Sequence, residues 1–269
     1  MILDRPKVSI LLATLNGARF LEPQLRSILQ QKHRPWDLIL SDDGSYDDTL
    51  SIAQEVIPEK QLKLLEGPRL GLTQNFWNAL QHVPLGHYAA FCDQDDVWRQ
   101  CKLTRALDHL SGQTGPAVYA SGRIVTNDDL EIQWYQKRRK VGAFAQLLFR
   151  NQIAGHTCVL NPKAVKALQR YAPPANVPFH DWWSALILKG IGAQFIHDPT
   201  PTLYYRQHTN NVIGARRGRT KALLDGRYNL WLQNNFDALW PLRENFTSGA
   251  RHALRVCLPL RAGLSLTQR

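Results

Sequence analysis

Runs of apolar residues alternate with helical repeats along the first hundred positions of the chain. The first run, VSILLA at residues 8–13, starts with a β-branched side chain and is typical of a strand buried on both faces. The segments between such runs repeat their apolar positions at helical spacing. Strands that alternate with helices predict a parallel sheet covered on both faces, an α/β fold. The expected strands are residues 8–13, 36–40, 62–65 and 88–92, and the expected helices are residues 20–29, 50–57 and 72–83.

Polar residues follow the strands of this first half at the points where the strands end. Thr14 and Asn16 follow the first strand, Asp42 and Asp43 follow the second, and the sequence DQDD at residues 93–96 follows the fourth. Because open α/β sheets bind ligands beyond the carboxyl ends of their strands, we expect these side chains to line one edge of the sheet, where a nucleotide would bind. The alternative for Asp42 and Asp43 is capping of the next helix.

The acidic turn at residues 93–96 brings together the carboxylates of Asp93, Asp95 and Asp96. Crowded carboxylates repel one another unless a positive charge lies among them. Mg²⁺ favours a few carboxylate oxygens together with the oxygens of a substrate phosphate. The pattern therefore predicts a divalent-cation site, and the alternative is a solvated turn that caps the next helix. Neither GxGxxG nor GxxxxGK[ST] occurs, which disfavours a dinucleotide-binding domain and excludes a P-loop protein.

The second half of the chain shows similar elements in a less regular order. The sequence VPFHDWW precedes an apolar helix, so Asp181 lies where a carboxylate favours the helix dipole. A later strand ends in the sequence YRQH, which brings Arg206 and His208 to the end of that strand. The expected strands are residues 117–121, 156–160 and 202–206, with helices at residues 144–149 and from Asn161-Pro162 onward.

Length and composition fit one large domain, or one domain with an appended tail, because the chain has 269 residues of which 44% are hydrophobic. The four cysteines are scattered without a CxxC pair, which favours reduced thiols in a cytoplasmic protein over a disulfide framework or a zinc site. The N-terminal sequence lacks the pattern of a signal peptide. No uncharged apolar stretch approaches the roughly 18 residues of a transmembrane helix, so we expect none.

The net charge of +11 is concentrated at the C-terminal end, where residues 216–269 hold ten Arg or Lys residues against three acids. Such a balance suits anionic partners, which include phospholipid headgroups, nucleic acid and phosphate-bearing substrates. The basic run at residues 137–140 is by default a solvated loop, and the alternative is contact with a lipid phosphate or an anionic acceptor.

A helical repeat in residues 250–258 divides into two faces. This pattern fits a helix that lies on an anionic membrane, and it equally fits a helix that packs on the domain and exposes its basic face to solvent. The apolar face contains Ala250, Ala253, Leu254, Cys257 and Leu258, and the basic face contains Arg251, His252 and Arg255.

Three segments taken together resemble glycosyltransferase family 2, whose members have the GT-A fold. They are VSILLATLNGARFLEPQLRSILQQ, DLILSDDGSYDDT and FCDQDDVWRQCKL. The sequences ATLNG, DQDDVW, HDWW and YRQH are most similar to the bacterial rhamnosyltransferase branch. The resemblance covers Lys7 to Ala215 and implies a Rossmann-like, mostly parallel sheet flanked by helices. It divides the chain into a GT-A domain at residues 1–215, with a nucleotide-sugar half at 1–110 and an acceptor half at 111–215, and a basic helical C-terminal extension at 216–269.

The resemblance implies a role for each motif. Asp181 would be the catalytic base, and because HD replaces the family's ED, His180 is not expected to act as a second acid. The matches of Gly71 and Asn75 to the family are looser. The nucleotide-binding residues would be Thr14, Asn16, Asp43, Arg69 and Asp93. The ligands of Mg²⁺ or Mn²⁺ would be Asp93, Asp95, Asp96 and His208, and contact with the diphosphate or the acceptor would come from Trp182, Trp183 and Arg206.

The activity that the resemblance implies is an inverting, metal-dependent glycosyl transfer. Rhamnose would move from dTDP-rhamnose to a saccharide or lipid-linked saccharide during synthesis of a bacterial surface polysaccharide such as lipopolysaccharide or O-antigen. The nearest alternative donor is a UDP-sugar carrying galactose or an N-acetylhexosamine. The enzyme is expected in the cytoplasm, at the inner face of the plasma membrane.

A basic, non-catalytic nucleic-acid-binding protein is the alternative from another class. The net charge of +11 and the eight tryptophans would suit it, since aromatic and basic side chains together bind single strands. The clustered acids would repel a nucleic-acid phosphate, so we expect no nucleic-acid partner.

Overall fold

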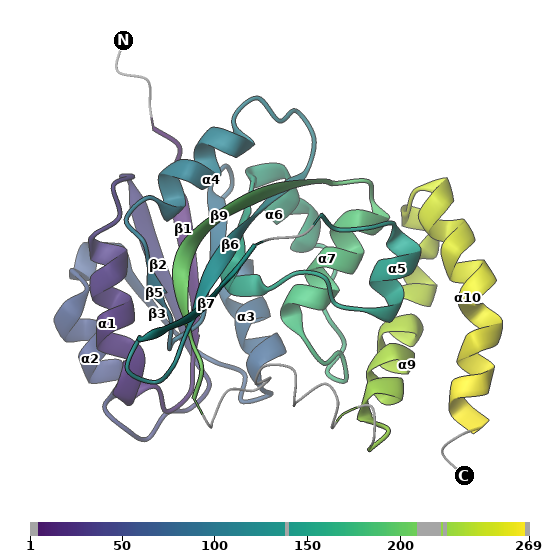
Figure 1. Ribbon diagram of the computed structural model, residues 1–269, viewed down its shortest axis with the longest axis horizontal. Helices are drawn as coiled ribbons and strands as arrows, with labels where there is room; N and C mark the ends of the chain where they lie inside the picture. Colours follow the sequence, from purple (N-terminus) through teal and green to yellow (C-terminus); the bar gives the residue numbers. More distant parts are fainter. Residues whose placement is uncertain (1–4, 138–139, 209–221, 223–224, 267–269) are drawn as a thin grey trace.

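The computed structural model describes residues 5–137, 140–208, 222 and 225–266, with side chains described as far as Cys257. Most of these residues form a curled sheet with helices on both of its faces (Figure 1). The strands of the first and second halves of the chain join near the centre of this sheet.

The first half has the elements that the hydrophobic pattern predicts. Every residue of β1 (Val8–Thr14) is buried, and its neighbours on both sides run parallel to it. Leu21, Leu25 and Ile28 lie on the buried face of the helix that follows, because their spacing matches the helical period. The other strands are β2 (Trp36–Asp42), β3 (Leu62–Glu66) and β4 (Tyr88–Cys92), and the helices are α1 (Ala18–Leu29), α2 (Thr49–Val56), the 3-10 turn η1 (Glu59–Gln61) and α3 (Leu72–Gln81).

The second half supplies the other side of the sheet around β6 (Ala117–Thr126). β9 (Gln194–Arg206) runs parallel to β6, whereas β8 (Cys158–Leu160) and β7 (Ile132–Gln136) run antiparallel to it. β8 also pairs with β4 and thereby joins the two halves. β5 (Val97–Trp98), which follows the acidic turn, pairs antiparallel with β9. The order of the described strands is β3-β2-β1-β4-β8-β6-β9-β5, with β7 beside β6.

All three strands expected in the second half have different bounds, and the one expected at residues 117–121 extends to Thr126 as β6. The strand expected at residues 156–160 begins with a 3-10 turn, η2 (Gly155–Thr157), and the last strand begins at Gln194 instead of residue 202. The pattern also gave no sign of β7, whose five residues are all exposed. An exposed edge strand has no buried apolar face, so it leaves no period-two signal in the sequence.

Hydrophobic clusters lie on both faces of the sheet, and one of them is centred on the helices of the second half. Asn161 and Pro162 start a helix as predicted, because the Asn161 side chain accepts a hydrogen bond from the N–H of Ala164 (2.9 Å). The helices are α4 (Lys102–Leu110), α5 (Phe144–Phe149), α6 (Pro162–Leu168), α7 (His180–Gly190), α9 (Arg227–Leu239), the 3-10 helix η3 (Trp240–Asn245) and α10 (Ser248–Leu266).

The C-terminal helices α9 and α10 lie beyond α5 and α7, at the end of the molecule opposite α1 and α2 (Figure 1). Ala250, Leu254 and Cys257 are buried in the same hydrophobic cluster as α7, so the apolar face of α10 packs on the domain. The alternative that placed this face on a membrane is therefore wrong for these three residues, and the Leu258 side chain lies outside the described part. The expected boundary at residues 215–216 also lies outside it.

Among the described residues, no helix is long and apolar enough to cross a membrane.

Candidate active site

The carboxyl ends of β1 and β2 are tied together by Asp42. The Thr14 hydroxyl donates to Oδ1 of Asp42 at 2.7 Å. Oδ2 of Asp42 accepts from the backbone N–H groups of Gly44 and Ser45, at 3.1 and 2.7 Å. Thr14 and Asp42 are only 1% and 7% exposed. Their side chains therefore close the turn after β2, and Asp42 does not cap the following helix.

Asp43 joins this turn to the loop before α3. Its Oδ1 accepts from the N–H of Arg69 at 2.6 Å, and its Oδ2 accepts from the N–H of Gly71 at 2.8 Å. Arg69 has a φ of 59°, in the left-handed region that non-glycine residues rarely adopt. Its side chain lies against Gly44, where an added Cβ would come within 3.2 Å of Nε. The structure thus brings together Asp43 and Arg69, two of the residues predicted to bind the nucleotide.

Asn16 and Gln94 connect the loop after β1 to its neighbours. The N–H of Asn16 donates to Oγ of Ser45 at 2.8 Å, and its Oδ1 accepts from the N–H of Tyr46 at 3.1 Å. Gln94 exchanges two hydrogen bonds with the backbone of Leu15. The loops after β1, β2 and β4 are therefore bonded to one another, as expected if they form one edge of the sheet.

Gly71 and Asn75, the two looser matches to the family, support the same edge. Gly71 has a φ of 88°, which glycine adopts without strain, and it precedes α3. Asn75 is 1% exposed and donates to the carbonyl oxygens of Thr14 and Ser41, at 3.2 and 2.8 Å. Asn75 thus holds the backbone at the ends of β1 and β2, and its buried side chain offers no surface to a ligand.

The acidic turn between β4 and β5 holds its three carboxylates at different depths. The side chains of Asp93 and Asp95 are 28% and 16% exposed, whereas that of Asp96 is fully buried. Burial, with repulsion from Asp95 and Asp93, raises the pKa of Asp96 well above its usual range. Burial and the charge of Asp93 also raise the pKa of Asp95. The acids are crowded as predicted, so a positive charge among them would be stabilised.

The two less buried acids each have a histidine partner. Nε2 of His208 lies 2.8 Å from Oδ2 of Asp95, and Nδ1 of His156 lies 2.8 Å from Oδ2 of Asp93. Burial by itself would raise the pKa of Asp93, but the hydrogen bond with His156 and nearby positive charges lower it. Burial lowers the pKa of His156. His208 was predicted, whereas His156 was missed, because its only signal was one polar residue at the start of an apolar run.

Arg206 supports the acidic turn from β9. Its Nε donates to the carbonyl oxygen of Asp95 at 3.0 Å, and its Nη1 donates to the carbonyl oxygen of Asp128. The guanidinium also lies 4.7 Å from the ring centre of Phe20, and the residue is 5% exposed. These contacts correct the expectation that Arg206 meets the diphosphate or acceptor: in this structure it braces the turn and presents little surface to a ligand.

Asp181, the predicted base, lies in the first turn of α7 and is held by three hydrogen bonds. Oδ1 accepts from Nδ2 of Asn151 at 2.9 Å and from the N–H of Trp182 at 2.7 Å. Oδ2 accepts from the N–H of Gly155 at 3.2 Å. Because His156 is the next residue and contacts Asp93, the 3-10 turn η2 connects the predicted base to the acidic turn.

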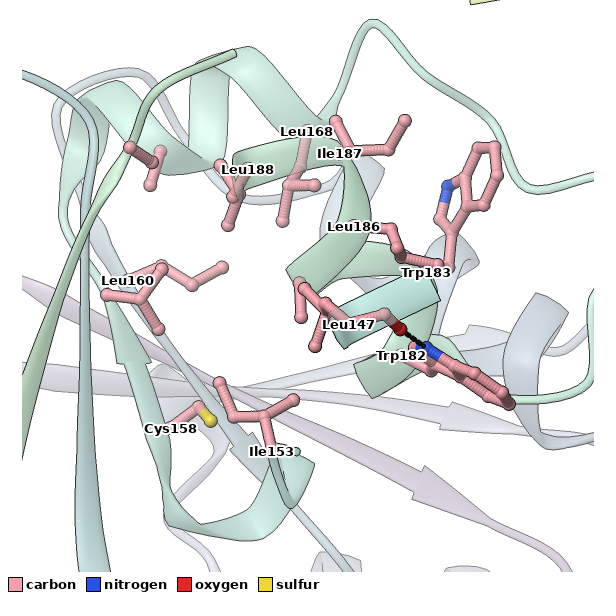
Figure 2. Packing of buried hydrophobic residues seen from close by; sticks show 14 of the residues in the cluster. Leu147, Ile153, Cys158, Leu160, Leu168, Trp182, Trp183, Leu186, Ile187 and Leu188 are labelled. Carbon is pink, nitrogen blue, oxygen red and sulfur yellow. Dashed lines mark hydrogen bonds between the residues drawn. The ribbon is translucent and has the colours of Figure 1, made fainter. Parts of the chain in front are cut away.

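The neighbours of Asp181 in α7 do not face a ligand. Trp182 and Trp183 are each 1% exposed, and their indole N–H groups donate to the carbonyl oxygens of Leu147 and Tyr171, at 2.7 and 2.9 Å. Figure 2 shows both rings within the core around α7. The expectation that they contact the diphosphate or acceptor is therefore corrected, since they pack the core. His180 is also buried, with its ring centre 3.9 Å from that of Phe76.

The acidic turn fits a hard divalent cation. Ligand atoms of Asp93, Asp96 and His156 all lie within 4.8 Å of one another. Oδ2 of Asp96 is buried and accepts no hydrogen bond from any described residue, so a cation would satisfy it. Asp95 and His208 form a second acid–histidine pair at the same turn. Carboxylates of this kind suit Mg²⁺ and Mn²⁺.

The fold and these motifs define a class of protein, the GT-A glycosyltransferases. The profile of glycosyl transferase family 2 matches residues 9–167, more than half of the chain, and the protein belongs to this family. Among solved structures, the fold is similar to that of S. aureus TarS 1-349 in complex with UDP-GlcNAc, with a TM-score of 0.67 and 15% identity over 92% of this chain and 69% of that fragment. It is also similar to the mannosyltransferase PcManGT from Pyrobaculum calidifontis in complex with GDP-Man and Mn²⁺, with a TM-score of 0.61 and 17% identity over 97% and 76% of the two chains.

Two relatives by sequence are bacterial glycosyltransferases. The chain is 28% identical over 224 residues to the dTDP-rhamnosyl transferase RfbG of Shigella flexneri, which covers 76% of this chain and 74% of RfbG. It is 24% identical over 206 residues to WfaP of Escherichia coli, a UDP-Glc:alpha-D-GlcNAc-diphosphoundecaprenol beta-1,3-glucosyltransferase, which covers 76% of this chain and 79% of WfaP.

Proposed function

We propose that the protein is an inverting, metal-dependent glycosyltransferase that moves a sugar from a nucleotide-sugar donor to a saccharide or lipid-linked saccharide. The observation that carries this proposal is the arrangement around η2. Gly155 binds Asp181 through its N–H, and the next residue, His156, contacts Asp93. Transfer with inversion needs a stabilised leaving group on one side of the anomeric carbon and a base beside the attacking hydroxyl. A carboxylate linked to a diphosphate-binding turn meets this need.

Asp181 takes the role of the base in this proposal. Its three hydrogen bonds leave the carboxylate in a fixed orientation, so that one oxygen can receive the proton of the acceptor hydroxyl as that hydroxyl attacks.

The edge formed by the loops after β1, β2 and β4 takes the donor. Asp43 and Arg69 bind the nucleotide, with Asn16 and the backbone at Thr14 beside them. Asp93, Asp95, Asp96 and His208 would hold Mg²⁺ or Mn²⁺, whose charge would stabilise the leaving diphosphate. Binding of both sugars at this edge aligns the attacking hydroxyl with the anomeric carbon.

The proposed donor is dTDP-rhamnose, and the support for it is the similarity to RfbG over three quarters of both chains. A UDP-sugar is the second candidate. Its support is the similarity to WfaP, whose donor is UDP-Glc, together with the likeness in fold to TarS, which was solved with UDP-GlcNAc. The similarity to RfbG and to WfaP, whose acceptor is a diphosphoundecaprenol-linked sugar, also supports a place in the synthesis of a bacterial surface polysaccharide such as O-antigen.

We place the enzyme at the cytoplasmic face of the bacterial membrane, where a lipid-linked acceptor would be presented. The support is the C-terminal excess of basic residues and the diphosphoundecaprenol acceptor named for WfaP. Because the apolar face of α10 is buried, contact with the membrane would depend on exposed basic side chains such as Arg255.

A donor screen tests the proposed activity. The protein is incubated with Mg²⁺ and, in turn, dTDP-rhamnose, UDP-glucose, UDP-galactose and UDP-N-acetylglucosamine, with water as a slow acceptor. Phosphorus NMR follows release of the nucleoside diphosphate, and proton NMR reports the configuration of the first sugar released. We expect dTDP-rhamnose to be consumed fastest, with inversion. Release of a sugar with retained configuration would refute the inverting mechanism, and consumption of none of the donors would refute the activity.

A further inference from the structure

The imidazole of His156 is held between two charged side chains. Its Nδ1 lies 2.8 Å from Oδ2 of Asp93, and its Nε2 lies 2.9 Å from Nη1 of Arg123. The residue is 5% exposed, and its ring stacks on Tyr205 with 4.8 Å between the ring centres. The buried ammonium of Lys102 donates to the backbone carbonyl of His156 at 2.8 Å. Ring and backbone are therefore both fixed.

Arg123 determines which nitrogen of the ring carries the proton. An arginine side chain can only donate hydrogen bonds, so Nε2 of His156 must accept from it and bears no proton. The single ring proton is then on Nδ1, which donates to the carboxylate of Asp93. The donors thus follow one direction, from Arg123 to His156 to Asp93.

Arg123 is itself positioned by neighbouring strands. Its Nε donates to Oε1 of Gln136 in β7 at 2.8 Å. Its guanidinium carbon lies 4.2 Å from the ring centre of Tyr205 in β9. A planar group with these two contacts keeps Nη1 directed at His156, which a lysine could not reproduce.

This direction of donation conflicts with a role for His156 as a metal ligand. Histidine binds a metal through a nitrogen that carries no proton. The nitrogen near Asp93 and Asp96 is Nδ1, which carries the proton, while the proton-free Nε2 is covered by Arg123. Ligation through Nδ1 would require the proton to move to Nε2, where it would oppose the N–H of Arg123.

We propose that His156 is a positioning residue and not a metal ligand: Arg123 and His156 form a donor chain that fixes the carboxylate of Asp93 for the metal-bound diphosphate. This inference rests on the proposed function, because it concerns the cation and diphosphate of that site. By proximity alone, Asp93, Asp96 and His156 would form a three-ligand metal site. The proposal removes His156 from these ligands. The cation would then be held by the acids and His208.

Nitrogen-15 NMR of the histidine rings tests the proton position directly. The wild-type protein is labelled at its nine histidines, and two-bond proton–nitrogen correlations are recorded without metal and then with saturating Mg²⁺. The signal of His156 is the one lost in His156→Asn. We expect a protonated Nδ1 and a proton-free Nε2, unchanged when Mg²⁺ is added. A protonated Nε2, or loss of the proton from Nδ1 on addition of Mg²⁺, would overturn the inference.

The affinity for Mn²⁺ separates positioning from ligation. The amide N–H of an asparagine lies close to the place of Nδ1–H, so His156→Asn retains a donor to Asp93, whereas His156→Ala does not. We expect a Kd for Mn²⁺ within about threefold of wild type for His156→Asn and about tenfold weaker for His156→Ala. Equal losses of Mn²⁺ affinity in both variants would show that His156 is a metal ligand. His252→Asn, on the exposed part of α10, is the matched control and should leave the Kd unchanged.

A double-mutant cycle tests the link to Arg123. If Arg123 acts through His156, the loss of Mn²⁺ affinity in Arg123→Met combined with His156→Ala equals that in His156→Ala alone. Additive losses would contradict the donor chain. Failure of the proposed function would appear as absent nucleotide-sugar binding in the wild-type protein. The NMR result for the metal-free protein does not depend on that binding, so the two failures can be distinguished.

Discussion

The two halves of the molecule present their functional side chains in different ways. In the first half, Asp43 and Asp93 directly follow buried parallel strands, so the order of the sequence alone brings them to one edge. In the second half, His156, Asp181 and His208 come from a 3-10 turn, a helix and the region after a long strand. His156 and His208 reach the acids only because β8 pairs with β4 and β5 pairs with β9.

The two groups of functional side chains therefore depend on different parts of the structure. The donor edge is built from local turns whose hydrogen bonds lie within or between neighbouring loops. The partners of the acidic turn depend on tertiary pairing of strands far apart in the chain. Changes in the second half should therefore alter the chemistry or the whole fold, whereas changes at the first-half turns should act more locally.

The largest expected effect comes from Asp181, the second-half residue proposed as the base. Asp181→Asn keeps the shape of the side chain but removes the proton acceptor, so kcat should fall by about 10³-fold. Binding of dTDP measured by calorimetry should stay at the wild-type value, because the donor edge is untouched. Asp108→Asn, at an exposed position of α4, is the matched control. Turnover near that of wild type in Asp181→Asn would place the base elsewhere.

The next effect concerns Asp95 in the first half. Asp95→Asn removes one negative charge from the acidic turn and should weaken dTDP binding in the presence of Mg²⁺ by about tenfold or more. In the presence of a chelator, the variant and the wild type should bind equally weakly. An equal loss with and without Mg²⁺ would mean that Asp95 acts without the cation.

Asp198 tests how far the second half depends on a buried ion pair. Burial alone would raise the pKa of Asp198, but hydrogen bonds from Arg105, Thr200 and Tyr119 outweigh it and hold the pKa at about 2. Because this pKa lies below the unfolded value near 4, the stabilisation is present above pH 4 and is lost as the pH falls towards 2. Asp198→Asn should lower the free energy of unfolding by about 2 kcal/mol at pH 7.

Urea unfolding at pH 7 and at pH 3 measures this contribution of Asp198. The difference between the variant and the wild type should shrink at pH 3, and Asp108→Asn should show no such difference at either pH. A loss of stability that is independent of pH would show that packing, and not the charge of Asp198, is responsible.

The smallest expected effect is at Asp42, which closes a first-half turn. Asp42→Asn replaces one carboxylate oxygen by a donor that faces other donors, so the free energy of unfolding should fall by about 1 kcal/mol. Hydrogen exchange should rise at the N–H groups of Gly44 and Ser45, while the second half keeps its protection. Increased exchange throughout the molecule would contradict the local character of this turn.

The sequence was most informative where chemistry follows directly from a strand end. Asp93 to Asp96 and His208 lie together as expected, because the apolar runs before them define strands of one sheet. His156 and Arg123 could not be predicted, since neither belongs to a recognisable motif and their contact depends on β6 and β8 being neighbours.

Sequence patterns were least informative for elements that are buried on nearly all sides or whose amphipathic face has more than one suitable partner. α7 is buried on nearly all sides, so its sequence could not tell that Trp182 and Trp183 face the core whereas Asp181 binds the η2 turn. The amphipathic pattern of α10 likewise fits a membrane surface or a neighbouring helix equally well, and only the structure identifies α5 and α9 as its partners.

The central claim is that the acidic turn after β4 binds a nucleoside diphosphate through a divalent cation. The most direct measurement is calorimetry of dTDP binding to the wild-type protein with Mg²⁺ or Mn²⁺, repeated after addition of excess chelator. The account predicts binding with the metal present and its loss with the chelator. Binding of dTDP with unchanged affinity in the presence of chelator would contradict the claim.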